Sequence, residues 1–271
     1  MVIHISHDSS GESVLLAAAF GDRPGRWPLP AATSPDQLWL RAVAAAGQGR
    51  YGSAYADLDA LLRAAPSGRL ASLANSTRAS FLRQLGWHDL ARGWDGRALA
   101  QAGDDPEVTG DALIGLAADA LGVGRLAVAA TLLTRAEPFV TCAPHRVAVR
   151  RAWVAAELAM AGGDGNAAVR NAEAGVELAA STLDGAARHG AKSQVVLAAA
   201  LCSAGAVDRA RPVAEAALEL TGDLGLIPLR WALACLLVDL ANAEGRIAEL
   251  SDIRDECAAR VERWGGTWRR R

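Results

Sequence analysis

The chain has 271 residues, of which 51% are hydrophobic, 21% charged and 5% aromatic, and its formal net charge is -2. A net charge this close to zero produces no overall field that would select nucleic acid or an anionic membrane surface. The longest apolar stretches, residues 195–201 and 232–238, are shorter than the ~18–20 residues that a membrane-spanning helix requires. The composition therefore predicts a cytoplasmic protein with no membrane partner, and its net charge does not favour nucleic acid.

Residues 1–34 come first and do not follow the repeat that organises the rest of the chain. Ser9, Ser10 and Gly11 form one turn signal, and Pro24 followed by Gly25 forms another. A short helix is expected over residues 13–20. Two interpretations of this segment stay open, namely a cap that lies over the first repeat and a flexible leader.

From residue 35 onward a six-residue pattern recurs, consisting of a glycine, four residues, and then a small or aliphatic residue. The pattern begins at Gly49, Gly86, Gly124, Gly163, Gly205 and Gly245, with a spacing of 37 to 42 residues. A regular period of this size predicts helix pairs that stack on one another. The glycine is expected at the turn within each pair, where positive φ is common and a Cβ is disfavoured.

The first pair opens with a capping box. Ser34 is expected at the N-cap, Pro35 at the first helical position and Gln37 at the third. We call the helix before each turn helix A and the helix after it helix B. Pro138 is expected to end the third helix B and to leave residues 138–144 as a loop. The predicted A helices cover about 35–46, 70–85, 106–121, 145–160, 187–203 and 228–243, and the last B helix ends near 264.

The first turn and its helix B resemble the second half of a tetratricopeptide repeat. The residues that carry the resemblance are Gly49, Tyr51, Ala54, Leu58, Leu61, Leu62 and Pro66. The likeness covers residues 35–264 and weakens in later repeats, where the closing proline is missing, and the period exceeds the 34 residues of that family. It implies an all-α fold, a right-handed α-solenoid of about six antiparallel helix pairs.

In that family the A helices line a concave groove that holds a peptide or a helix of a partner protein. Alignment on the turn glycines implies that this groove is lined by Trp39, Thr77, Ser80, Arg83, Gln84, Arg150, Trp153 and Glu157. The family's Lys and Asn clamp for a peptide carboxylate is not supplied at the matching positions, which include Val43, Asp111 and Gly115. The sequence therefore predicts a non-catalytic protein-interaction module with a different recognition chemistry.

The C-terminal residues 265–271 form a basic tail that offers an alternative function. Trp268 with Arg269, Arg270 and Arg271 could contact nucleic acid through stacking and phosphate contacts. The favoured interpretation is that Trp264 caps the last hydrophobic layer and that the tail frays. Exposed ends of a repeat array could also support a homo-oligomer.

Catalysis, metal binding and cofactor binding find little support in the sequence. Cys142 and His145 are three residues apart in the predicted loop, but no cue supplies an oxyanion hole. His4 and His7 have no carboxylate that would complete a metal site. We therefore expect no enzyme activity, no metal and no cofactor.

Overall fold

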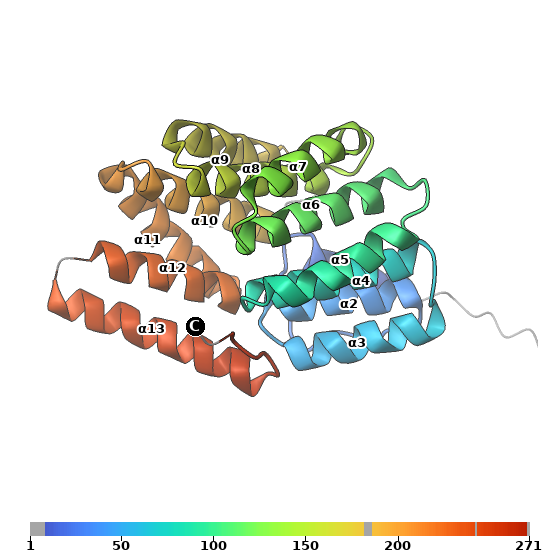
Figure 1. Cartoon of the computed structure of the whole chain (residues 1–271). Coiled ribbons are helices and arrows are strands. Elements are labelled where there is room, and N and C mark those ends of the chain that lie inside the picture. Colours follow the sequence, from blue (N-terminus) through green and yellow to red (C-terminus); the bar gives the residue numbers. More distant parts are fainter. Residues whose placement is uncertain (1–8, 182–185, 242, 270–271) are drawn as a thin grey trace, which may run out of the picture.

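The computed structural model describes residues 9–181, 186–241 and 243–269, and these ranges contain thirteen helices and no strand (Figure 1). This confirms the predicted all-α fold. In chain order the helices are α1 (Ser9–Ala19), α2 (Pro35–Gly47), α3 (Tyr51–Ala64), α4 (Arg69–Gln84), α5 (His88–Gln101), α6 (Pro106–Gly122), α7 (Leu126–Val140), α8 (His145–Ala161), α9 (Gly165–Ala180), α10 (Ala187–Ser203), α11 (Val207–Asp223), α12 (Ile227–Leu240) and α13 (Glu244–Arg263).

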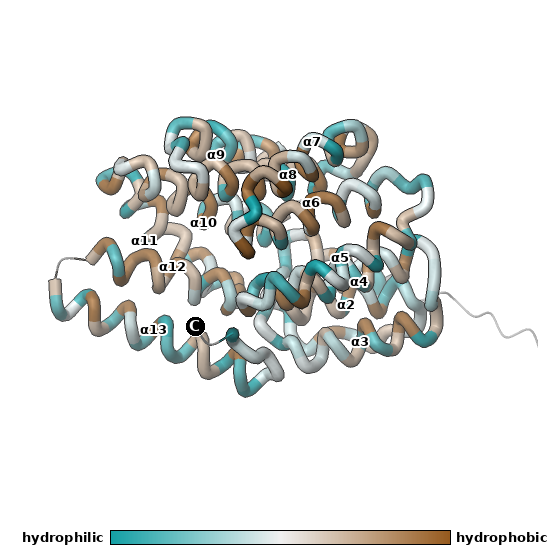
Figure 2. The backbone as a smooth tube through the Cα atoms, viewed as in Figure 1, coloured by the Kyte–Doolittle hydropathy of each residue, from teal (hydrophilic) through white to brown (hydrophobic). Residues whose placement is uncertain are grey.

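The helices that follow α1 form six antiparallel pairs, α2 with α3 through α12 with α13, and the pairs stack into a curved solenoid (Figure 1). Each helix A packs on its own helix B and also on the helix A of the next pair. The A helices α2, α4, α6, α8, α10 and α12 therefore form the inner layer. Figure 2 shows hydrophobic and hydrophilic residues alternating along the outer helices α3 and α13, as expected for helices with one buried face.

The predicted cap of the first pair is present with one change. Ser34 is the N-cap of α2, and its side chain accepts a hydrogen bond from the Gln37 backbone N–H at 3.3 Å. The Gln37 Oε1 atom accepts from the backbone N–H of Thr33 at 2.8 Å, one residue before the position of a standard capping box. The cap thus fixes the entry of α2 and the end of the preceding segment together.

Five of the six predicted turn glycines adopt the expected left-handed conformation, with φ between +76° and +91°. They are Gly49, Gly86, Gly124, Gly163 and Gly205. The prediction for Gly245 is wrong, because α13 already begins at Glu244. The residues on either side of the last connection, Ala241 and Ala243, are extended, and extended backbone needs no glycine.

The prediction that the third helix B ends before Pro138 is also wrong. Helix α7 continues through Pro138 to Val140, so the connection to α8 is confined to residues 141–144. A proline so close to the C-terminal end removes one backbone hydrogen bond. Phe139 and Val140 pack on the core that contains Leu133, and this contact holds the last turn in place.

The solenoid curls until its last pair meets its first. The Gly52 N–H donates to the Trp264 carbonyl at 2.7 Å, and the Arg269 N–H donates to the Leu85 carbonyl at 2.9 Å. Figure 1 accordingly shows the end of α13 beside α3. The N-terminal segment joins the same closure, since the Ala187 N–H at the start of α10 donates to the Gly21 carbonyl at 3.2 Å.

The largest hydrophobic core reflects this closure. It combines buried residues of α1 to α4, such as Leu15, Leu40 and Tyr51, with Ile227 of α12 and Val261 of α13. Residues far apart in the sequence therefore share one core. Helix α1 packs on α2, so the described part of residues 1–34 lies over the first pair, while residues 1–8 lie outside the described residues.

No helix in the described ranges combines the length and the apolar character that crossing a membrane requires.

Candidate ligand-binding site

A cavity of about 360 Å³ lies inside the curved array, lined mainly by residues of the A helices. The structure brings together in its wall all eight residues that sequence alignment placed on the groove. They are Trp39 of α2, Thr77, Ser80, Arg83 and Gln84 of α4, and Arg150, Trp153 and Glu157 of α8. These positions on α2, α4 and α8 therefore lie around one cavity.

Four rings form a row along one side of the cavity. The Phe20 ring lies 5.3 Å from the ring of Trp39 and 6.2 Å from that of His189, measured between centroids. His189 stacks on Trp153 at 5.6 Å with an interplanar angle of 23°. The row joins the end of α1, α2, α10 and α8, so it exists only because the solenoid curls back on its N-terminal segment.

Hydrogen bonds fix the orientation of both indoles. The Trp39 Nε1–H donates to Thr77 Oγ1 at 3.0 Å, and the Trp153 Nε1–H donates to Ser193 Oγ at 2.8 Å. Both polar ends are thereby satisfied by the neighbouring A helix. The two rings are therefore held rigidly, with His189 stacked on Trp153 and the Arg146 guanidinium 5.6 Å from the centroid of Trp39.

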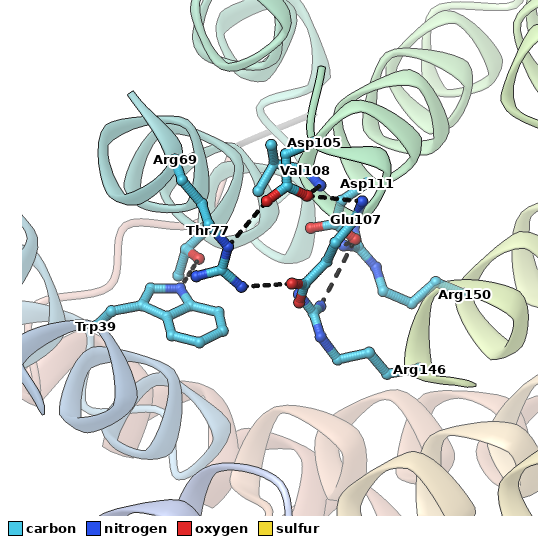
Figure 3. A network of polar contacts seen from close by, with 9 residues as sticks. All are labelled: Trp39, Arg69, Thr77, Asp105, Glu107, Val108, Asp111, Arg146 and Arg150. Carbon is cyan, nitrogen blue, oxygen red and sulfur yellow. Dashed lines mark hydrogen bonds and ion pairs between the residues drawn. The ribbon is translucent and has the colours of Figure 1, made fainter. Parts of the chain in front are cut away.

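Charged residues form a ladder across the inner wall. Arg69, Glu107, Arg146 and Arg188 each stand 17 residues before a turn glycine (Gly86, Gly124, Gly163 and Gly205, respectively), so they occupy equivalent places near the starts of α4, α6, α8 and α10. Glu107 is bridged by its neighbours on both sides, with an ion pair to Arg69 and one to Arg146 at 2.5 Å (Figure 3). Arg69, Glu107 and Arg146 are therefore linked by ion pairs across three neighbouring A helices.

A second pair supports this ladder from inside the same wall. Arg150 makes an ion pair with Asp111, and Arg146 approaches the same carboxylate at 3.8 Å (Figure 3). Burial alone would raise the pKa of Asp111, but the charges of Arg150 and Arg146 outweigh it and hold the pKa below its ordinary value. Asp111 is therefore ionised at neutral pH.

Arg188 differs from the other three residues of the ladder in its contacts. Within the described residues, no carboxylate lies at ion-pair distance from it, and its guanidinium donates to the Val43 carbonyl at 3.2 Å. Burial, with the charges of Arg146 and Arg150 added, lowers the pKa of Arg188 to about 10. Arg188 is still protonated at neutral pH, but its charge is held in an unfavourable place.

His189 adds a neutral polar edge to the ring row. His189 is 4% exposed. Burial is the main reason that its pKa lies well below the ordinary value, and the charges of Arg188, Arg146 and Arg150 lower the pKa further. Its Nδ1 atom has no hydrogen-bond partner among the described residues. His189 is therefore an uncharged imidazole at neutral pH.

Arg83 anchors a buried acidic pair at another side of the cavity. Its guanidinium donates to both Asp95 and Asp119, at 2.9 Å for Asp119, and both carboxylate side chains are 0% exposed. Burial, reinforced by the charge of Asp95, raises the pKa of Asp119 to about 7, and burial also raises that of Asp95. Two acids that share one guanidinium in this way keep one proton between them.

The cavity residues that sequence reasoning missed include Phe20, Arg188 and His189. The spacing of Arg188 from its turn glycine is the same as that of Arg146, and this signal could have found it. No comparable signal marks Phe20, because it lies outside the repeat. His189 follows Arg188 in the sequence, so the signal that marks Arg188 would also have drawn attention to it.

Trp268 and Arg269, two of the four residues considered for nucleic-acid contact, make contacts within the protein. The Trp268 ring stacks on Trp231 with centroids 4.3 Å apart, and Arg269 makes an ion pair with Asp89 at 2.8 Å. Arg270 and Arg271 lie outside the described residues. The described part of the tail thus contributes to the closure of the solenoid.

Among the described residues, no group of three or more His, Cys, Asp and Glu side chains is arranged to hold a metal ion. The four cysteines are free thiols.

No family model and no curated protein matches this sequence. The likeness to tetratricopeptide repeats therefore stays a resemblance, and function has to be inferred from the cavity.

Proposed function

We propose that this chain is a non-catalytic binding protein of the tetratricopeptide-like type, and that its central cavity receives an extended end of a partner peptide. The observation that supports this most is the convergence of eight groove positions, drawn from three repeats, on one cavity inside the curled solenoid. Concave, largely preformed cavities of this size are typical ligand sites.

The cavity has room for a short segment of a partner chain. Its volume of about 360 Å³ is in the range typical of ligand sites. A helix with side chains is about 10 Å across, so an extended segment is the narrower occupant. We therefore choose the extended segment as the occupant to test.

The walls are suited to binding with little reorganisation. Trp39 and Trp153 are large rings whose N–H groups are already bonded to Thr77 and Ser193. Rings held in this way present apolar area without losing further rotamer freedom when a ligand arrives. These rings are therefore expected to be the main affinity anchors.

The second function considered from the sequence, nucleic-acid binding through the C-terminus, gains no support. Trp268 already stacks on Trp231, and Arg269 is already paired with Asp89. We therefore do not propose it.

A peptide selection tests the proposal. A library of random hexapeptides displayed with free C-termini is selected on the wild-type protein and counter-selected on Ser80→Phe, which places a ring in the cavity from α4. Val128→Ala on α7, where the side chain is 47% exposed, is the matched control on the outer surface.

The proposal predicts a family of peptides that bind wild type and Val128→Ala equally and bind Ser80→Phe at least tenfold more weakly. Peptides that bind all three proteins alike, or a library that yields no binder to a folded wild type, would contradict it.

A further inference from the structure

Building on the function proposed above, we propose that Arg188 binds a carboxylate of the ligand and that the ligand's apolar body lies against the ring row of Phe20, Trp39, Trp153 and His189.

The first step is the charge balance among the residues around Arg188 on the inner layer. The ladder and its support contain three cations (Arg69, Arg146 and Arg150) and three carboxylates (Asp105, Glu107 and Asp111) that pair with one another. Lys192 is paired with Glu157 at 3.4 Å. After these pairings, Arg188 remains as a positive charge without a carboxylate among the described residues.

The second step is the place of that charge. Arg188 lines the cavity, and its guanidinium carbon lies 5.9 Å from the centroid of the Phe20 ring. A Cβ at position 47 would lie only 3.1 Å from the Arg188 Cδ, so Gly47 permits the close approach of this side chain to α2. Arg188 is thus held at the joint between the two ends of the solenoid, beside the ring row.

The third step is the chemistry that suits a guanidinium with no ion-paired carboxylate in the described part of the chain. A carboxylate carries one negative charge and matches the planar donor fork of arginine, whereas a phosphate with nearly two negative charges would need a second free cation. The adjacent rings then select an apolar or aromatic group next to the carboxylate. The charges of Arg146 and Arg150 disfavour the protonated form of Arg188 and lower its pKa. A ligand carboxylate beside Arg188 would offset this repulsion.

Two sources carry this chemistry, namely a free organic acid and the C-terminal carboxylate of a peptide. The experiment compares matched acids and amides in two arms, with the full-length protein and ligand-observed NMR titration. The first arm uses 3-phenylpropanoate and 3-phenylpropanamide. The second uses a hexapeptide of five alanines and a final phenylalanine, with a free or an amidated C-terminus.

Wild type is expected to bind the acid at least about tenfold more tightly than the amide, because charge-assisted hydrogen bonds are the strong ones. Arg188→Gln is expected to remove this preference and Arg188→Lys to retain part of it. Arg63→Gln, which removes an exposed arginine of α3, is the matched control and keeps the full preference. The arm with the larger preference identifies the source.

The outcomes separate this inference from the function on which it rests. Equal binding of acid and amide by wild type overturns the carboxylate assignment and leaves the binding function standing. A preference that persists in folded Arg188→Gln also overturns it, because another residue then holds the anion. If wild type binds neither member in either arm, the inference falls, and the peptide selection alone decides the proposed function.

Discussion

The buried acid Asp119 gives the sharpest stability prediction. In the folded protein its side chain is 0% exposed and its pKa is raised from 3.8 to about 7, chiefly by burial. The folded state therefore keeps a proton that the unfolded chain releases above about pH 4. This proton stabilises the fold fully below about pH 4, and the contribution is lost as the pH rises to about 7.

The size of the effect follows from the shift. A change from 3.8 to about 7 is roughly three pKa units, which corresponds to at most about 4 kcal/mol at 1.36 kcal/mol per unit. The test is Asp119→Asn, which keeps the shape and one acceptor for Arg83 but cannot titrate. Urea denaturation of both proteins is measured from pH 4.5 to 8.5, and the unfolding free energies are compared at each pH.

The difference, wild type minus Asp119→Asn, is expected to fall by about 1 kcal/mol per pH unit up to pH 7 and then to level off. Comparison of the two proteins cancels the titration of most other groups. Asp59→Asn, where the carboxylate is 47% exposed and paired with Arg78, is the control and should show no such slope. A difference that stays constant or rises with pH would refute the assignment of the shared proton to this pair.

Three further substitutions test the closure and the turns, and urea denaturation measures all of them. Trp268→Ala is expected to lower the free energy of unfolding by about 2 kcal/mol, because it removes the stacking on Trp231 of α12 and the packing of the Trp268 ring on the core that the last pair shares with the first; an unchanged value would contradict the closure. Gly124→Ala is expected to cost about 1 kcal/mol, because its φ of +77° disfavours a Cβ. Gly245→Ala is expected to add up to about 1 kcal/mol, because this glycine is helical and nothing lies within 4 Å of the added Cβ; a loss of stability there would contradict the position of α13.

The fold was largely predictable because each turn carries a local requirement. A glycine such as Gly124 follows its helix at positive φ, and that need is visible in the sequence itself. Gly245 shows where the rule fails, since it lies inside α13 and the extended residues Ala241 and Ala243 impose no such need. Pro138 shows a second failure, because the packing of Phe139 keeps the helix going past a residue that usually ends one.

The site was predictable only in part. Alignment on the turns places side chains such as Trp39 and Trp153 on the inner layer, because the repeat fixes which helical positions face inward. Whether the array curls far enough to bring Phe20 beside His189 depends on the sum of many small rotations between pairs, which no single residue encodes. The ring row and the position of Arg188 therefore required coordinates.

The most direct test of the account is a crystal structure of the protein bound to the tightest peptide from the selection. The account predicts that the final residue of the peptide lies inside the cavity, with its carboxylate on Arg188 and its apolar side chain against Phe20 and Trp153. A peptide bound on the outer helices would contradict this prediction. So would a peptide whose C-terminus lies away from Arg188 while the solenoid keeps its conformation.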